Sequence, residues 1–333
     1  MRLRFVVPEL DGPSTGGTVY NRELVRALAE LGVSGDVLDV SRAEHALAAG
    51  ETGTYWLDTL FLAELPRLRQ LAVGELRLGL IAHYLPALVR YGASVTRAQL
   101  SPAELSALDR MDAFVAPSEF MRATLVRLGA RAGSVVVAEP GRLASGLAPL
   151  REPSAAVRAL VVAHLVPGKG VDRLLAALAT HLEPADELTL EVAGSVTQDA
   201  AYAEGCRVFA TAPSLRERVT LLGELTPDGV NERMATCDLV LSASRMEAFG
   251  MALAEARALG VPIIARAGGN AENLVSAASG GELVTDAAGV AAASVALCRD
   301  RAELAARRER ARAQALPPRP WRRTAEDFLL APH

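Results

Sequence analysis

Short runs of apolar and β-branched residues alternate with longer segments of helical periodicity along the whole chain. Continuous apolar strands between helices are typical of a parallel sheet, because helices cover both of its faces. In the first half these runs lie at 4–7, 36–40, 54–57, 76–82, 113–116 and 134–137, and a second series begins near residue 158. The pattern predicts an α/β protein with two doubly wound parallel sheets in tandem.

The length of 333 residues also favours two domains, since a single core of that size is uncommon. Residues 140–156 hold three prolines and two glycines without periodicity, and they are the expected linker. We expect one Rossmann-like domain over 1–150, a second over 151–315, and a terminal helix over 316–333. Ligands of such sheets bind beyond the carboxyl ends of the strands, so two facing domains predict a cleft between them.

Composition excludes several classes of protein. The net charge of −4 argues against a nucleic-acid binder. Three widely spaced cysteines, Cys206, Cys237 and Cys298, indicate neither a metal site nor a disulfide framework and favour a reduced, cytoplasmic setting. No apolar stretch approaches the roughly 18 residues that cross a bilayer. The arginine-rich segment 299–315 fits a solvated helix face or, alternatively, peripheral contact with anionic lipid at the inner membrane surface.

Two segments have the composition of anion-binding turns. Gly16 and Gly17 stand in a glycine-rich loop between the first strand and the first helix, where backbone N–H groups approach a phosphate closely. Lys169 follows a Pro-Gly turn at the end of the first strand of the second series and could meet a diphosphate as a point charge. The alternatives are an ordinary strand-to-helix turn and a solvated lysine.

Residues 244–274 hold two glutamates that flank a predicted helix start. Glu247 lies on the loop after a strand, and Glu255 is expected about two turns into the helix that ends at Gly260. The N–H groups around Phe249 and Gly250 would face a phosphate, while Glu255 could accept hydrogen bonds from the two vicinal hydroxyls of a ribose. The alternative is a pair of exposed glutamates stabilised by the helix dipole.

These segments together resemble the retaining glycosyltransferases of family 4, which have the GT-B fold. The resemblance rests on E-x7-E with F-G after the first glutamate, on the K-G segment at 163–178, on the G-G-x-x-E after the next strand, on the glycine loop at 13–21, and on the segment 115–129. It is weak in the first half and strong over residues 159–275.

The resemblance implies a nucleotide-sugar donor, UDP- or GDP-linked, held mainly by the second domain. An acceptor hydroxyl of a glycan, lipid or small metabolite would bind to the first domain, and the sugar would be transferred with retention. The implied donor-binding residues are Gly16, Gly17, His164, Lys169, Glu247, Phe249, Gly250, Met251 and Glu255. The implied catalytic residues are His83, Lys169 and Glu247. No Asp-x-Asp motif stands out, so we predict metal-independent transfer without a cofactor.

Two positions depart from the family pattern. His164 replaces the arginine that normally precedes the lysine by five residues, and Ala243 replaces the proline before the motif serine. Histidine is largely neutral at pH 7 and lacks the bidentate fork of arginine, so either Arg173, Arg245 or Arg266 compensates or diphosphate binding is weaker. Because of this departure, one alternative is a non-catalytic protein that binds sugar nucleotides and acts as the partner of a true transferase. A GT-B sugar epimerase or phosphorylase is a further alternative.

Overall fold

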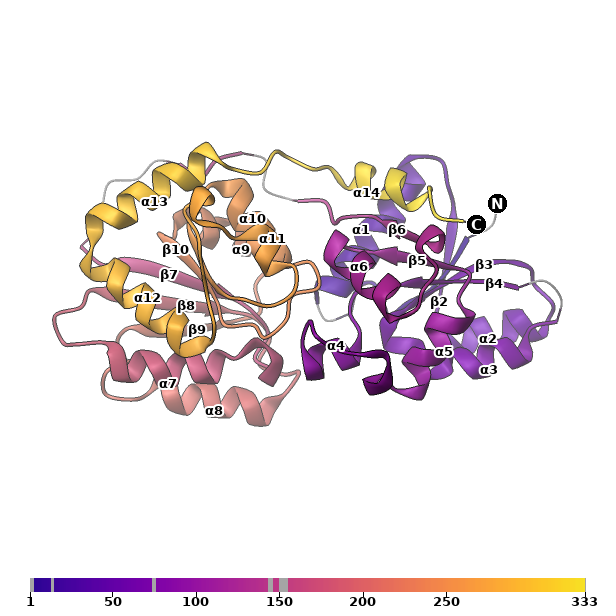
Figure 1. Cartoon of the computed structure of the whole chain (residues 1–333), viewed down its shortest axis with the longest axis horizontal. Helices are drawn as coiled ribbons and strands as arrows, with labels where there is room; N and C mark the ends of the chain where they lie inside the picture. Colours follow the sequence, from indigo (N-terminus) through magenta and orange to yellow (C-terminus); the bar gives the residue numbers. More distant parts are fainter. Residues whose placement is uncertain (1–2, 13–14, 74–75, 143–145, 150–154, 333) are drawn as a thin grey trace. The chain divides into compact units, whose positions relative to one another are not determined.

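The computed structural model describes residues 3–12, 15–73, 76–142, 146–149 and 155–332. The chain forms two compact units (Figure 1): unit 1 comprises Met1–Gly141 and Arg319–His333, and unit 2 comprises Arg142–Pro318. The predicted boundary between residues 150 and 151 and much of the predicted linker lie outside the described residues.

Unit 1 is built around a six-stranded parallel sheet with the order β2-β1-β3-β4-β5-β6. Its strands are β1 (Leu3–Val6), β2 (Gly35–Leu38), β3 (Gly53–Asp58), β4 (Leu76–Ile81), β5 (Ala113–Ala116) and β6 (Val135–Val137). Its α-helices are α1 (Gly16–Glu30), α2 (Val40–Ala48), α3 (Leu65–Leu71), α4 (Pro86–Tyr91), α5 (Pro102–Arg110), α6 (Glu119–Leu128) and α14 (Trp321–Phe328). Each strand coincides with one of the apolar runs in the sequence, within one or two residues.

The last helix, α14, packs against α1 and β6 in unit 1 although it is far from them in the sequence. The Phe328 ring is fully buried, with its centroid 4.7 Å from that of Trp56 and 5.7 Å from that of Phe5. The Tyr20 hydroxyl donates a 2.8 Å hydrogen bond to the Ala138 carbonyl. Aromatic contacts therefore fix the end of the chain to the core of this unit.

The first helix begins earlier than the glycine-rich sequence indicates. Helix α1 starts at Gly16, so Gly16 and Gly17 form its first turn rather than a loop before it. Thr15 and Thr18 make a reciprocal capping box that satisfies the N–H groups at this end. The beginning of the predicted glycine loop, residues 13–14, lies outside the described residues.

Unit 2 contains a second six-stranded parallel sheet with the order β12-β11-β10-β7-β8-β9. Its strands are β7 (Val157–Val162), β8 (Leu188–Ala193), β9 (Val219–Gly223), β10 (Leu239–Ser242), β11 (Ile263–Arg266) and β12 (Glu282–Val284). Its α-helices are α7 (Val171–His181), α8 (Ala200–Ala210), α9 (Pro227–Thr236), α10 (Met251–Leu259), α11 (Ala271–Leu274), α12 (Ala287–Arg299) and α13 (Arg301–Ala313).

Two apolar clusters cover the two faces of this second sheet. On one face, side chains of α7, α8 and α12 pack against alternate strand residues such as Leu241 and Ile264. On the other face, α9, α10 and α11 pack against the intervening residues, among them Val240 and Ile263. The predicted doubly wound arrangement is therefore present, with helices on both sides of a parallel sheet.

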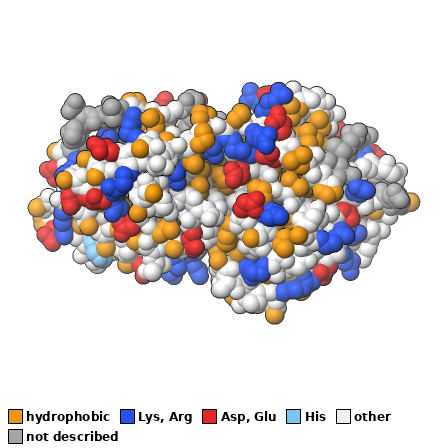
Figure 2. All heavy atoms as spheres, turned by 45° about the horizontal axis from the view of Figure 1, so that its top comes forward, with side chains coloured by type: hydrophobic (Ala, Val, Ile, Leu, Met, Phe, Trp, Pro, Cys, Tyr) orange, Lys and Arg blue, Asp and Glu red, His pale blue; other side chains and the backbone are white. Residues whose placement is uncertain are grey.

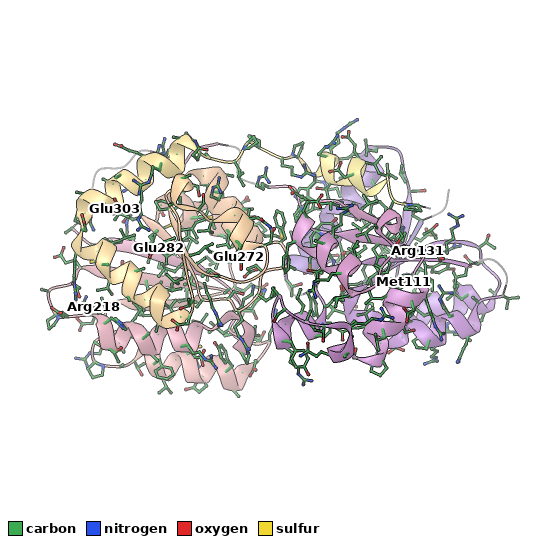
Figure 3. All side chains as sticks on the ribbon, viewed as in Figure 1. Met111, Arg131, Arg218, Glu272, Glu282 and Glu303 are labelled. Atoms are coloured by element: carbon green, nitrogen blue, oxygen red, sulfur yellow. The ribbon has the colours of Figure 1, made fainter. Side chains whose placement is uncertain are left out.

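The arginine-rich helix α13 is held to unit 2 by ion pairs. Arg307 contacts Glu282 at 2.8 Å and Glu303 at 3.0 Å, both labelled in Figure 3, and Arg308 contacts Asp238 at 3.1 Å. Figure 2 likewise shows basic and acidic side chains next to one another on the visible surface. Among the described residues, no helix is both long and apolar enough to cross a membrane.

Candidate functional site

In unit 2 the strand order changes direction between β7 and β10, which lie side by side in the sheet. In open parallel sheets, ligands bind outside the carboxyl ends of the strands at such a switch point. His164 follows β7 and Glu247 follows β10, so both predicted residues lie at this edge. Lys169 ends the short 3-10 turn Pro167–Lys169 that precedes α7.

Lys169 and Glu247 contact each other across the switch point. The Lys169 ammonium donates a 2.7 Å hydrogen bond to the Glu247 carboxylate, and the side chains are 31% and 15% exposed. The Arg245 N–H also donates to the Gly168 carbonyl at 2.9 Å, which ties the loop after β10 to the lysine turn. An ammonium has three N–H donors, so the contact with Glu247 leaves capacity for an anionic ligand.

A second loop, which follows β11, holds the loop of Glu247 in place. Glu247 and Gly269 form an isolated parallel bridge, and the Asn270 N–H donates to the Glu247 carbonyl at 2.7 Å. The buried Asn270 amide donates a further 2.7 Å hydrogen bond to the Phe249 carbonyl. Gly269 has a φ of +66°, and a Cβ there would lie 2.3 Å from the Glu247 carbonyl oxygen, so glycine is required. Sequence reasoning missed Asn270, which has no role in the E-x7-E pattern.

Helix α10 presents an uncapped N-terminus beside this pair. Its N-cap, Gly250, is left-handed with a φ of 86°, and no side chain caps the first turn. Phe249, Gly250 and Met251 all lie at this end, as expected. The first N–H groups of a helix carry a partial positive charge, and they suit an anion when no side chain occupies them.

Glu255 is the fifth residue of α10 and lies in its second turn, close to the predicted depth of about two turns. Its side chain is half-buried, and among the described residues it has no hydrogen-bond or ion-pair partner. Burial raises the pKa of this carboxyl group to about 7. A carboxylate without a partner among the described residues, close to an uncapped helix N-terminus, is well suited to accept hydrogen bonds from ligand hydroxyl groups.

His164 is fixed by a backbone group. The buried Ser195 N–H donates a 3.0 Å hydrogen bond to His164 Nδ1, so the imidazole acts as an acceptor at this atom. Of the three arginines that could compensate for the missing one, Arg173 and Arg245 are exposed, and neither has an ion pair with a described residue. Arg266 is half-buried at the end of β11, and its Nε is buried without a hydrogen-bond partner among the described residues.

The remaining predicted residues gather in unit 1, at the carboxyl ends of β1, β3 and β4. His83 follows β4 and lies against Gly17, where a Cβ would be 3.3 Å from the ring. Two residues that the sequence analysis did not single out, Asn21 and Asp58, contact the same imidazole. Asp58 ends an apolar strand, and a polar residue at that position is the signal that could have identified it.

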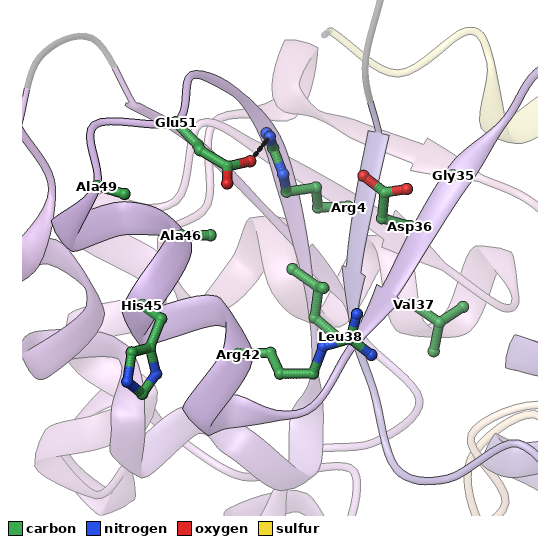
Figure 4. A pocket seen from close by; sticks show the side chains of 10 residues that line it. All are labelled: Arg4, Gly35, Asp36, Val37, Leu38, Arg42, His45, Ala46, Ala49 and Glu51. Carbon is green, nitrogen blue, oxygen red and sulfur yellow. Dashed lines mark hydrogen bonds and ion pairs between the residues drawn. The ribbon is translucent and has the colours of Figure 1, made fainter.

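A further cavity lies away from these residues. It has a volume of about 710 Å³ and is bounded by β2 and α2 in unit 1 (Figure 4). The buried Arg4 guanidinium closes one side through an ion pair with Glu51. None of the predicted site residues lines it, so the strand-end clusters are the better candidates. Among the described residues, no group of three His, Cys, Asp or Glu side chains could hold a metal ion.

The sequence of unit 2 matches a known protein family. The family of glycosyl transferases group 1 matches residues 148–314, half of the chain. The chain belongs to this family. The matched region contains His164, Lys169, Glu247 and Glu255, so the geometry described above lies within the family's own domain.

Solved structures of other proteins have the same fold over nearly the full length of the chain. Sucrose-phosphate synthase from Thermosynechococcus elongatus superposes with a TM-score of 0.76 at 21% identity, covering 98% of this chain and 97% of the other. HepE from Anabaena, solved in complex with UDP-glucose, superposes with a TM-score of 0.75 at 19% identity, covering 99% and 98%. These similarities confirm the predicted GT-B class of fold with two Rossmann-like units.

One curated relative aligns over a shorter region. D-inositol 3-phosphate glycosyltransferase from Segniliparus rotundus is 32% identical over 127 residues, which are 38% of this chain and 28% of that protein. The chain thus matches little more than a quarter of this relative.

Proposed function

We propose that this group 1 glycosyltransferase moves a sugar from a nucleoside diphosphate sugar to an acceptor hydroxyl group, with retention at the anomeric carbon. The observation that carries the proposal is the half-buried Glu255, which has no partner among the described residues and lies beside the uncapped N-terminus of α10. The HepE complex with UDP-glucose, a protein of the same fold, supports a UDP-linked donor, and a GDP-linked donor is the alternative.

Each residue of unit 2 would then hold a different part of the donor. Glu255 would accept hydrogen bonds from the two ribose hydroxyls, an interaction that favours its charged form. The N–H groups at Phe249, Gly250 and Met251 would hold the phosphates. Glu247, on the loop before the helix, would contact a hydroxyl of the transferred sugar.

Lys169 would act mainly on the transition state. Departure of the nucleoside diphosphate concentrates negative charge on the leaving oxygen, and a fixed ammonium stabilises that charge more than it stabilises the ground state. The 2.7 Å contact with Glu247 holds the lysine in place before the donor binds. His164 would add one N–H donor at most, which is a weaker diphosphate contact than an arginine fork.

The acceptor would attack from the face that the leaving group vacates, and the departing phosphate would take its proton. No separate base or metal ion is needed for this route. The first unit would contribute Gly16, Gly17 and His83 near the reacting sugar. The three cysteines are free thiols, which fits our placement of the reaction in the cytoplasm, with at most peripheral membrane contact.

A panel of UDP-, GDP- and ADP-sugars tests the proposal, with nucleotide release measured in the presence of EDTA. Release of UDP or GDP supports a metal-independent transferase, and NMR of the anomeric proton of the product tests retention. Nucleotide binding without release from any donor would instead support a non-catalytic binding partner, for which His164 in place of arginine is the favouring observation. If UDP, GDP and ADP all fail to raise the Tm of the protein, the transferase function and the binding-partner function are both contradicted.

A further inference from the structure

Three polar side chains of unit 1 form a buried hydrogen-bonded cluster around one imidazole. His83 Nε2 lies 2.9 Å from Asn21 Oδ1 and 3.3 Å from Asp58 Oδ2. Asn21 Nδ2 donates a 2.7 Å hydrogen bond to the same Asp58 oxygen. The side chains of Asp58 and His83 are 2% and 10% exposed, and Asn21 is fully buried.

The geometry determines which atoms carry hydrogen. Only the NH₂ group of Asn21 can donate to a carboxylate, so its Oδ1 must face the imidazole. The Leu60 N–H donates to the other Asp58 oxygen at 2.9 Å. The neighbouring groups, with His83 foremost, outweigh burial and lower the pKa of Asp58, so this carboxyl group is ionised. Nε2 therefore faces two acceptors, and it must carry a hydrogen.

In its neutral form the imidazole then has a lone pair on Nδ1, because in that form only one ring nitrogen carries a hydrogen. Nδ1 has no hydrogen-bond partner among the described residues. The ring itself is held in place, since its centroid lies 5.1 Å from that of Tyr20 in an edge contact. On the other side Gly17 allows the helix backbone to approach, and a Cβ there would already be 3.3 Å from the ring.

A purely structural role explains this arrangement poorly. A buried ionised carboxylate is costly to desolvate, and a well-packed apolar group is often as stable in its place. Fixing one tautomer by a carboxylate on the opposite nitrogen is the arrangement by which enzymes prepare a histidine for substrate.

We propose that Asp58 and Asn21 are positioning residues that hold His83 with hydrogen on Nε2, so that Nδ1 accepts a hydrogen bond from a hydroxyl group of the sugar substrate. This inference rests on the proposed function for its substrate, but the tautomer is a property of the protein alone.

The decisive variant is Asp58→Asn. The Leu60 N–H needs an acceptor, so the new carboxamide keeps its oxygen there and turns its NH₂ group toward Asn21 and His83. The imidazole should respond by moving its hydrogen to Nδ1. Nδ1 then donates, and it can no longer accept the substrate hydroxyl.

Nitrogen-15 NMR of the side chains reads this change directly. The chain has five histidines, and comparison with His83→Gln assigns the signal of His83. We expect wild-type protein to have hydrogen on Nε2 and the Asp58→Asn variant to have it on Nδ1. A wild-type signal with hydrogen on Nδ1 overturns the proposal, whether or not the protein transfers sugar.

Kinetics provide the second measurement. With UDP-glucose, or the most active donor of the panel, Asp58→Asn should lower kcat at least tenfold and leave KM for the donor within about threefold, because the nucleotide is held by unit 2. Glu51→Gln is the matched control: it removes the partner of the buried Arg4 in the same unit, and it should leave kcat unchanged. An equal loss of kcat in both variants shows a structural effect and contradicts the proposal.

Asn21→Ala keeps the test decisive if Asp58→Asn does not fold. It removes one of the two acceptors that face Nε2, and it should lower kcat at least threefold with the tautomer partly shifted. Unchanged kcat with an unchanged His83 signal overturns the positioning role. If wild-type protein turns over no donor, the proposed function fails, while NMR still decides the tautomer.

Discussion

Replacing Glu255 by glutamine should make the protein more stable at alkaline pH and less able to bind its donor. Glu255 is a half-buried carboxylate without a partner among the described residues, and burial raises its pKa from 4.5 to about 7. Glutamine has nearly the same shape but no charge, so it isolates the effect of ionisation.

The direction of this change in stability with pH follows from proton linkage. Between pH 4.5 and 7 the unfolded chain loses this proton while the folded protein keeps it, so stability falls as pH rises through that window. A shift from 4.5 to about 7 corresponds to about 3 kcal/mol above pH 7, which is an upper bound because the side chain is partly exposed. We expect Glu255→Gln to gain about 1–3 kcal/mol at pH 8.5 and about a quarter of that gain at pH 5. In a unit of this size each kcal/mol of added stability raises Tm by roughly 2–4 °C.

Thermal unfolding at the two pH values is the assay for stability. Glu232→Gln serves as the control, because it removes an exposed carboxylate from α9 of the same unit and should change Tm at neither pH. Equal shifts of Glu255→Gln at pH 5 and pH 8.5, or no shift at either, would refute the reasoning.

Calorimetry of nucleotide binding completes the experiment. Ribose hydroxyls favour the charged form of Glu255, so binding of UDP or GDP to wild-type protein should strengthen from pH 6 to pH 8 and release part of a proton near pH 7. Glu255→Gln should bind at least tenfold more weakly at pH 8, a loss of about 1.4 kcal/mol, without pH dependence or proton release. Unchanged affinity would exclude the ribose role.

Three further substitutions test the rest of the unit 2 site. Lys169→Ala should weaken UDP or GDP binding about tenfold and change Tm little, because the ion pair is partly exposed; calorimetry and a thermal scan separate the two effects. His164→Arg should tighten nucleotide binding but destabilise the fold by about 1–3 kcal/mol, since the Ser195 N–H loses its acceptor; a variant without tighter binding would show that another group, such as Arg266, already fills the place. Asn270→Ala should cost about 1–3 kcal/mol in urea unfolding and also weaken nucleotide binding, and loss of stability alone would show that the Glu247 loop keeps its shape without this amide.

The elements of the fold could be predicted from local sequence because each strand is an apolar run bounded by turn residues. The start of α1 was predicted too late, since its capping box pairs Thr15 with Thr18 rather than with the usual glutamate or glutamine. The start of α10 at Met251 was predicted correctly, and the left-handed Gly250 is its N-cap.

Contacts between distant segments could not be predicted in the same way. Lys169 and Glu247 are 78 residues apart, and His83 and Asn21 are 62 residues apart. Parallel topology brings such residues to one edge of a sheet, but which side chains meet there depends on the strand order. Asp58 is the clearest example of a site residue that the sequence alone does not identify. A single aspartate after an apolar strand is also typical of an ordinary helix cap.

The two units depart from the rules of stable packing at their strand ends. Unit 2 leaves Glu255 half-buried without a counter-charge, and unit 1 buries the ionised Asp58 beside an imidazole. Arg307 and Arg308 of α13, by contrast, are paired with carboxylates. Selection for stability alone would replace a carboxylate whose burial raises its pKa toward 7. A neutral glutamine at that position would reduce the stability of the fold less at neutral pH. Residues that reduce the stability of the free protein are kept when a ligand supplies the missing partner. On this reasoning both carboxylates belong to binding sites, and a nucleotide should restore at unit 2 the stability that Glu255 removes.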